Sequence, residues 1–145
     1  MTVFADASAL VTLYAAEPGR RHLAAEPGVV IAQISRVEVP AALWRKQPLG
    51  ELEPGTVQVL TEAFEADFYG TDDEPPRFAA VVAGEAVFDR AAALCAAHGL
   101  RAYDAVQLAC ALAAREASPD CATLAAYDEN LRRAAAAEGF RLMPA

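Results

Sequence analysis

Short apolar runs alternate with segments of helical periodicity along almost the whole chain. Runs of strand character cover residues 2–5, 29–32, 78–82, 122–125 and 140–143. Helical patterns cover 8–16, a short stretch ending near 25, 35–46, 54–69, 84–98, 102–115 and 129–137. Strands that alternate with helices predict a parallel sheet covered on both faces. We therefore expect a three-layer α/β/α domain with a central, mostly parallel sheet.

Four acidic residues interrupt this apolar pattern where a strand ends or a helix begins. They are Asp6, Glu38, Asp104 and Asp128. Because the carboxyl ends of parallel strands share one edge of the sheet, we expect the four side chains to meet in one cleft. Each also has an ordinary structural explanation. Asp6 and Asp128 suit helix N-caps, and Asp104 suits the first turn of a helix. Glu38 suits a capping box with Ser35.

Four carboxylates in one cleft repel one another and need a counter-ion. Oxygen ligands of this kind suit Mg²⁺ or Mn²⁺. The chain has no Ser-His, Cys-His or lysine constellation for another catalytic chemistry, so metal-assisted hydrolysis is the predicted reaction class. A phospho-aspartyl hydrolase would need an aspartate in place of Ser8 and a late lysine. A response-regulator receiver would need an acidic pair after the first strand and a lysine near the last. The only lysine is Lys46, which suits neither class.

Composition supports one domain with a real core. The chain has 145 residues, 55% of them hydrophobic, and we expect residues 1–145 to form a single domain. No apolar run reaches the roughly 18 residues that span a bilayer, and the N-terminus lacks the features of a signal peptide, so a cytoplasmic location is expected. Cys95, Cys110 and Cys121 are widely spaced and are interpreted as core thiols. His98 and Gly99 are typical of a helix end.

The net charge of −8 comes from one segment. Eight of the 20 acids lie between Glu51 and Pro76, which contains no Lys or Arg. The remaining 12 acids balance the 12 basic residues. The acidic pI therefore does not exclude a local phosphate-binding site elsewhere in the chain.

The order and spacing of four motifs resemble those of PIN-domain ribonucleases, specifically the short single-domain toxins of VapBC-type toxin–antitoxin pairs. The resemblance covers essentially the full length. The motifs are Asp6-Ala7-Ser8-Ala9-Leu10, Ser35-Arg36-Val37-Glu38, Gly99-Leu100-Arg101-Ala102-Tyr103-Asp104-Ala105-Val106-Gln107-Leu108-Ala109 and Tyr127-Asp128-Glu129-Asn130-Leu131. One departure is Ala126, which stands where the family often has Thr or Ser, and it makes Asp128 the weakest of the matches.

The resemblance implies a site and an activity. Asp6, Glu38, Asp104 and Asp128 would be the catalytic acids that hold Mg²⁺ or Mn²⁺, with Ser8 beside the first of them. The reaction would be endonucleolytic hydrolysis of RNA. Arginines that flank the motifs are candidates for contact with substrate phosphates, and these are Arg36, Arg101, Arg132 and Arg133. The alternative is a catalytically inactive PIN-fold interaction module without a metal site.

The resemblance also implies partners, namely a cognate antitoxin that inhibits the enzyme and a second copy in a homodimer. An apolar groove for an antitoxin helix is predicted from Trp44, Leu60, Phe64 and Phe68. The neighbouring acids, Glu62 and Glu65 among them, would attract basic residues of the antitoxin. A solvated acidic face that binds nothing is the other interpretation of this segment.

Overall fold

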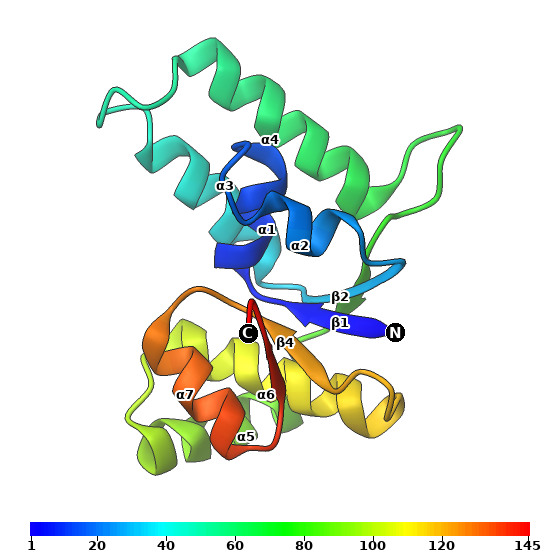
Figure 1. Ribbon diagram of the computed structural model, residues 1–145, viewed down its shortest axis with the longest axis vertical. Helices are drawn as coiled ribbons and strands as arrows, with labels where there is room; N and C mark the ends of the chain where they lie inside the picture. The colour runs from blue at the N-terminus through cyan, green and yellow to red at the C-terminus, as the bar shows by residue number, and fades with distance from the viewer.

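A five-stranded parallel sheet separates two layers of helices (Figure 1). The computed structural model describes residues 1–145, except for the side chain of Arg21. The strands are β1 (Thr2–Ala5), β2 (Gly28–Ala32), β3 (Ala79–Val81), β4 (Thr123–Ala125) and β5 (Arg141–Met143). The helices are α1 (Ala7–Tyr14), α2 (Arg20–Ala24), α3 (Ser35–Arg45), α4 (Pro54–Tyr69), α5 (Glu85–His98), α6 (Ala102–Ala117) and α7 (Glu129–Ala137).

The strand order β3-β2-β1-β4-β5 places the first strand in the centre of the sheet. Ala5 of β1 pairs with Ile31 of β2 on one side and with Ala125 of β4 on the other. The chain first extends outward through β2 and β3, and then returns to add β4 and β5 next to β1. The order therefore reverses between β1 and β4. In open parallel sheets, the crevice outside the carboxyl ends of the strands at such a point is the usual ligand site.

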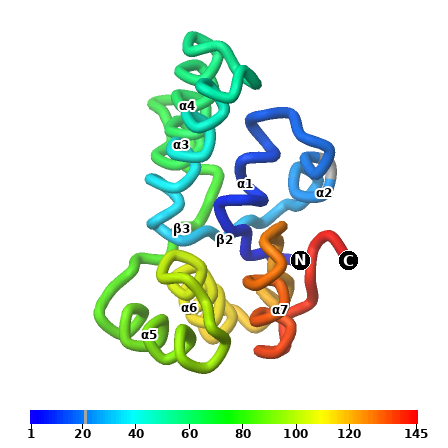
Figure 2. The backbone as a smooth tube through the Cα atoms, turned by 90° about the vertical axis from the view of Figure 1, so that its left-hand side faces the viewer, coloured from blue at the N-terminus to red at the C-terminus, as the bar shows by residue number. Residues whose placement is uncertain are grey.

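Successive residues of β1 point to opposite faces of the sheet and enter two separate cores. Val3 and Ala5 pack with α1, α3 and α4 on one face. Phe4 packs with α5, α6 and α7 on the other face, together with Leu124 of β4. Figure 2 shows the same two layers from the side. The expected three-layer α/β/α architecture is confirmed, and every strand pair of the sheet is parallel.

One local prediction is wrong. The capping box expected from Ser35 and Glu38 does not form, because Ile34 is the N-cap of α3 and no side chain caps this helix. The Ser35 hydroxyl instead accepts a hydrogen bond from Gln107 on α6, at 3.0 Å. Gln107 also donates to Glu38 at 3.2 Å. Two side chains that a local pattern assigned to a helix end thus contact a residue about 70 positions later in the chain.

The remaining sequence expectations concern thiols, one histidine and membranes. Cys110 and Cys121 are buried, as predicted for core thiols, and Cys95 is half-buried. Helix α5 ends at His98, and Gly99 follows in the left-handed conformation with φ 66° that glycine adopts without strain. Among the described residues, no helix has both the length and the apolar character needed to cross a membrane.

Candidate active site

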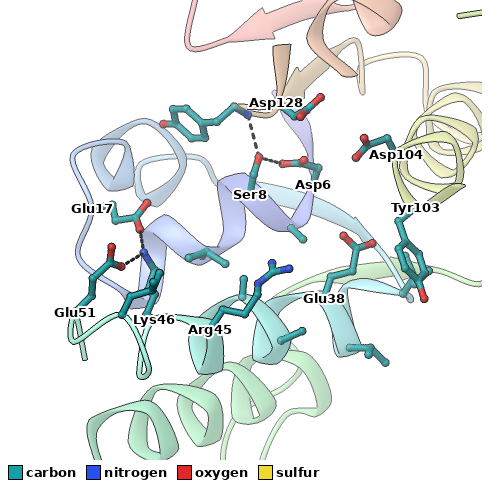
Figure 3. A pocket seen from close by; sticks show the side chains of 18 residues that line it. Asp6, Ser8, Glu17, Glu38, Arg45, Lys46, Glu51, Tyr103, Asp104 and Asp128 are labelled. Carbon is teal, nitrogen blue, oxygen red and sulfur yellow. Dashed lines mark hydrogen bonds and ion pairs between the residues drawn. The ribbon is translucent and has the colours of Figure 1, made fainter. Parts of the chain in front are cut away.

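A cavity of about 780 Å³ opens at the carboxyl edge of the sheet, beside β1 (Figure 3). All four acids that the sequence singled out line it, although they come from widely separated parts of the chain. The lining residues with polar or aromatic side chains are Asp6, Ser8, Glu17, Glu38, Arg45, Lys46, Glu51, Tyr103, Asp104, Tyr127 and Asp128. The expected convergence of the acids on one cleft is therefore observed.

Asp6 is held at the centre of this edge by the strand before it and the helix after it. Its backbone continues β1, and its Oδ1 accepts hydrogen bonds from the Ala9 amide at 2.9 Å and the Ser8 hydroxyl at 2.7 Å. Asp6 is thus both the N-cap of α1 and a cavity residue. Its side chain is only 4% exposed, and this burial raises its pKa from 3.8 to about 7. The two hydrogen bonds oppose the rise, while the charges of Glu38 and Asp104 add to it.

Ser8 joins two strand ends. Its hydroxyl donates to Asp6 and accepts a hydrogen bond from the Tyr127 amide at 2.9 Å (Figure 3). Tyr127 belongs to the segment that follows β4. One hydroxyl therefore fixes the Asp6 carboxylate and the backbone next to Asp128 in relation to each other.

Glu38 lies one turn into α3 and is held by an amide from the opposite layer. Its Oε1 accepts from Nε2 of Gln107, which is 1% exposed. Burial raises the pKa of Glu38; the hydrogen bond from Gln107 opposes this rise, the charge of Asp104 adds to it, and the charge of Arg45 opposes it. Oε1 of Gln107 is buried without a hydrogen-bond partner among the described residues. An amide that leaves one polar atom unsatisfied in order to hold Glu38 and Ser35 is costly to the fold and points to a role in the site.

Asp104 and Asp128 complete the set from α6 and α7. Asp104 lies in the first turn of α6 and is half-buried; its pKa is raised by burial and then by the charge of Asp128, while the charge of Arg101 lowers it. Asp128 is exposed and caps α7, with Oδ1 accepting from the Leu131 amide at 2.9 Å. Asp128 therefore both caps α7 and lines the cavity, as the two interpretations of the sequence predicted.

The donor set suits a hard divalent cation. Carboxylate oxygens are preferred ligands of Mg²⁺ and Mn²⁺. Burial raises the pKa values of Asp6, Glu38 and Asp104, and the charges of neighbouring acids add to this rise, so a bound cation would stabilise their ionised forms. In the described residues, however, no three acidic, histidine or cysteine side chains are gathered closely enough to hold one ion as they stand. The acids surround the cavity instead of forming a closed cage.

The predicted arginines do not line the cavity. Arg36 pairs with Glu65 and donates to the Tyr69 hydroxyl, both on α4. Arg132 donates to the carbonyls of Ala126 and Pro144 and so supports the loop before Asp128. Arg101 is exposed at the start of α6, near enough to Asp104 to lower its pKa, and Arg133 donates to Asn130 on the surface.

The cations that do line the cavity are Arg45 and Lys46, at the end of α3. Sequence inspection missed both. A signal was available, because Arg45 follows Glu38 by seven residues and two helical turns return it to the same face. Arg36, two residues before Glu38, points to another side of the same helix.

Comparison with known proteins identifies the family of the chain. The PIN domain family matches residues 3–137, which is nearly the whole chain. The chain belongs to the PIN domain family. A search among curated proteins gave no match. PIN domains are generally nucleases that depend on divalent metal ions, so membership supports a nuclease function.

The amide of Gln107 offers a test of how this PIN-domain site is supported. We expect Gln107→Leu to weaken Mn²⁺ binding by about 10- to 100-fold, because Glu38 loses the donor that orients it. The Tm of the metal-free protein should change by only a few degrees, since leucine fills the space and removes an unsatisfied oxygen. The rise in Tm with increasing Mn²⁺ measures this affinity. Gln58→Leu is the matched control, because it breaks a similar contact with Glu62 on the exposed side of α4. Equal Mn²⁺-dependent shifts in all three proteins would contradict the role of Gln107.

Proposed function

We propose that this protein is a metal-dependent endoribonuclease that hydrolyses RNA phosphodiester bonds. The observation that supports this most strongly is the convergence of Asp6, Glu38, Asp104 and Asp128 on one cavity at the switch point of a PIN-domain sheet. An inactive interaction module is not favoured, because nothing in such a module would maintain four carboxylates that repel one another around a cavity.

In this proposal, the four carboxylates hold Mg²⁺ or Mn²⁺. When bound, such an ion supplies Lewis acidity that polarises the phosphodiester and lowers the pKa of an attacking water. The chain's own part is to fix its ligands. Ser8 and the Ala9 amide hold Asp6, and Gln107 holds Glu38. The N-terminus of α7 holds Asp128 through the Leu131 amide. These contacts limit how far each carboxylate can move, so only a modest approach of the four side chains would be needed to close the site around an ion.

Two aromatic side chains support a single-stranded substrate. Tyr103 and Tyr127 each directly precede an acid of the set, line the same cavity and are 62% and 38% exposed. Unpaired bases stack on such rings, whereas bases within a duplex are not free to do so. Tyr127 is held in place by close packing on Gly19, where an added Cβ would lie 1.8 Å from the tyrosine hydroxyl. We therefore propose that the cleaved bond lies in an unpaired segment of RNA.

The function is tested with end-labelled RNA. The purified protein should cut single-stranded RNA at internal positions in Mg²⁺ or Mn²⁺, cut the same sequence more slowly in a duplex, and show no cleavage in excess EDTA. Mapping of the new ends identifies the target site. No metal-dependent cleavage of any cellular RNA fraction would contradict the proposal.

We further propose that the protein is the toxin of a toxin–antitoxin pair and acts as a homodimer, as the sequence resemblance implies. The structure changes the predicted antitoxin groove. Phe64 is fully buried, packing edge-on against Tyr14, and cannot line an open surface. Trp44 and Leu49 are exposed, and Leu49 lines the wall of the active-site cavity. An antitoxin that binds along the exposed part of α3 and extends to Leu49, just beyond the end of this helix, would also block the cavity.

Charge reversal tests the acidic part of this contact. Glu62→Lys should weaken the antitoxin complex by about tenfold in low salt and by less in high salt, because exposed charges are screened. Glu62 is more informative than Glu65, since Glu65 already pairs with Arg36. Binding is measured by calorimetry with the product of the neighbouring gene, at two salt concentrations. An unchanged affinity at low salt would rule out Glu62 as part of the interface.

A further inference from the structure

One face of α3 forms a continuous wall of the cavity. Val37 lines the cavity together with Glu38, Ala41, Ala42 and Arg45, and the last four follow the spacing i, i+3, i+4 and i+7 that places side chains on one side of a helix. Arg45 is seven residues beyond Glu38, which corresponds to roughly 10 Å along the helix axis. The two lining residues between them, Ala41 and Ala42, have only a methyl side chain. An apolar stretch of the wall therefore joins the Glu38 carboxylate to the Arg45 guanidinium.

The two cations that line the cavity differ in whether they already pair with an acid. Six acids and two cations line the cavity. Lys46 is neutralised by Glu17 at 2.6 Å and Glu51 at 3.2 Å. None of the ion pairs found among the described residues involves Arg45, which is exposed. Figure 3 shows its guanidinium turned toward the interior of the cavity, toward the side on which Glu38 lies.

A polyanionic strand entering a cavity with this surplus of acids needs a cation beyond those of the metal site. An arginine suits that need, because its planar guanidinium donates two parallel hydrogen bonds to the oxygens of one phosphate. The roughly 10 Å that separate positions 38 and 45 along the helix axis leave room for Arg45 to contact a phosphate other than the one that is cut.

We propose that Arg45 binds a backbone phosphate next to the scissile one, so that the RNA strand runs along α3 from Glu38 to Arg45. This inference rests on the proposed nuclease function and adds the direction of the strand and the residue that sets it. Arg45 is here a substrate-binding residue that does not touch the reacting atoms.

A different role for Arg45 is that of a counter-ion for Glu38, whose pKa its charge lowers. The two roles differ in what Arg45→Ala changes. Loss of a counter-ion changes the pKa of Glu38 and the stability of the metal-free protein, whereas the affinity for RNA at constant metal occupancy stays the same. Loss of a phosphate contact lowers RNA affinity and also its dependence on salt, because one fewer phosphate is neutralised.

The test measures binding without cleavage. Fluorescence anisotropy of a short single-stranded RNA is recorded over a range of KCl concentrations, without divalent metal, for proteins that all carry Asp104→Asn. Arg45→Ala should reduce affinity about tenfold and lower the slope of log K against log [KCl] by about 0.7. Arg45→Lys should keep the slope and lose only part of the affinity, since it retains the charge without the bidentate geometry.

Arg141→Ala is the matched control. It removes the same charge from an exposed arginine at the start of β5, at the opposite edge of the parallel sheet from the cavity. Unchanged affinity and slope in Arg45→Ala, or an equal loss in Arg141→Ala, would overturn the inference. Either result would leave the nuclease proposal intact if the protein with Asp104 restored still cuts RNA. Absence of cleavage by the unmodified protein would count against the nuclease function itself.

Discussion

Replacing Asp6 or Asp104 with asparagine is expected to slow RNA cleavage by at least about 100-fold, which corresponds to about 2.7 kcal/mol in the barrier. Both side chains line the cavity, and each contributes to the mutual repulsion that a bound cation would relieve. Asparagine keeps the size and one oxygen of each residue but removes the charge that attracts Mg²⁺. The loss should appear mainly in kcat, since the RNA-binding wall of α3 is unchanged.

This prediction has a control of equal charge. Asp72→Asn removes one carboxylate from the exposed loop before β3, at the other edge of the sheet, and should cleave RNA at the rate of the unmodified protein. Initial rates under single-turnover conditions in Mg²⁺ measure the effect. If Asp6→Asn or Asp104→Asn cleaves RNA as fast as Asp72→Asn, these carboxylates are not part of the catalytic site.

The same Asp6→Asn change should stabilise the metal-free protein. The pKa of Asp6 is about 7 in the folded chain and 3.8 in the unfolded reference. Between these values, the folded state holds a proton that the unfolded state has released, so the stability contributed by this group falls as pH rises from about 4 to 7. Above pH 7, the buried charge is fully present. Asparagine has no charge and still accepts from Ser8 and the Ala9 amide, as an N-cap should.

We expect a gain of about 2 kcal/mol for Asp6→Asn at pH 8, or roughly 5 °C in Tm, that shrinks toward zero near pH 4. Thermal unfolding in EDTA at several pH values measures it. A given concentration of added Mn²⁺ should raise the Tm of the unmodified protein by more than that of the variant. The contradicting result is a Tm difference between Asp6→Asn and the unmodified protein that is smaller at pH 8 than at pH 4. In that case, burial of the ionised Asp6 carboxylate does not destabilise the fold. Catalytic residues typically lower the stability of the ligand-free fold and are retained for their function.

The sequence predicted the layers and most of the element ends because the responsible forces are local. Apolar runs such as Val29–Ala32 identify buried parallel strands, and Gly99 ends α5 where a left-handed residue is needed. The convergence of the four acids was predictable for a different reason. Once every strand is parallel, the carboxyl ends of β1 and β4 lie at the same edge of the sheet, and this places Asp6 and Asp128 at that edge.

What the sequence did not predict depends on contacts between distant segments. The hydrogen bonds from Gln107 to Ser35 and Glu38 join α6 to α3, and no local pattern distinguishes them from a capping box. The rotation of α3 decides that Arg45 faces the cavity while Arg36 faces α4. The burial of Phe64 likewise depends on α4 packing against the α1–α3 layer, so this residue of the predicted groove belongs to the core, whereas Trp44 is exposed.

The departure at Ala126 also has a structural interpretation. Ala126 is fully buried, and its carbonyl accepts from Arg132 at 2.9 Å, so the loop before Asp128 is held through the backbone and not through a hydroxyl at this position. Asp128 is exposed and already uses one oxygen to cap α7. Of the four acids, it should therefore contribute least to metal affinity.

The central claim, that the four carboxylates form one metal site, is tested most directly by calorimetric titration of Mn²⁺. The unmodified protein and Asp72→Asn should bind Mn²⁺ with the same affinity. Asp6→Asn, Glu38→Gln and Asp104→Asn should each weaken it by at least about tenfold, and Asp128→Asn by less. Binding of Mn²⁺ to Asp6→Asn and Asp104→Asn with unchanged affinity, or no binding by the unmodified protein, would contradict the account.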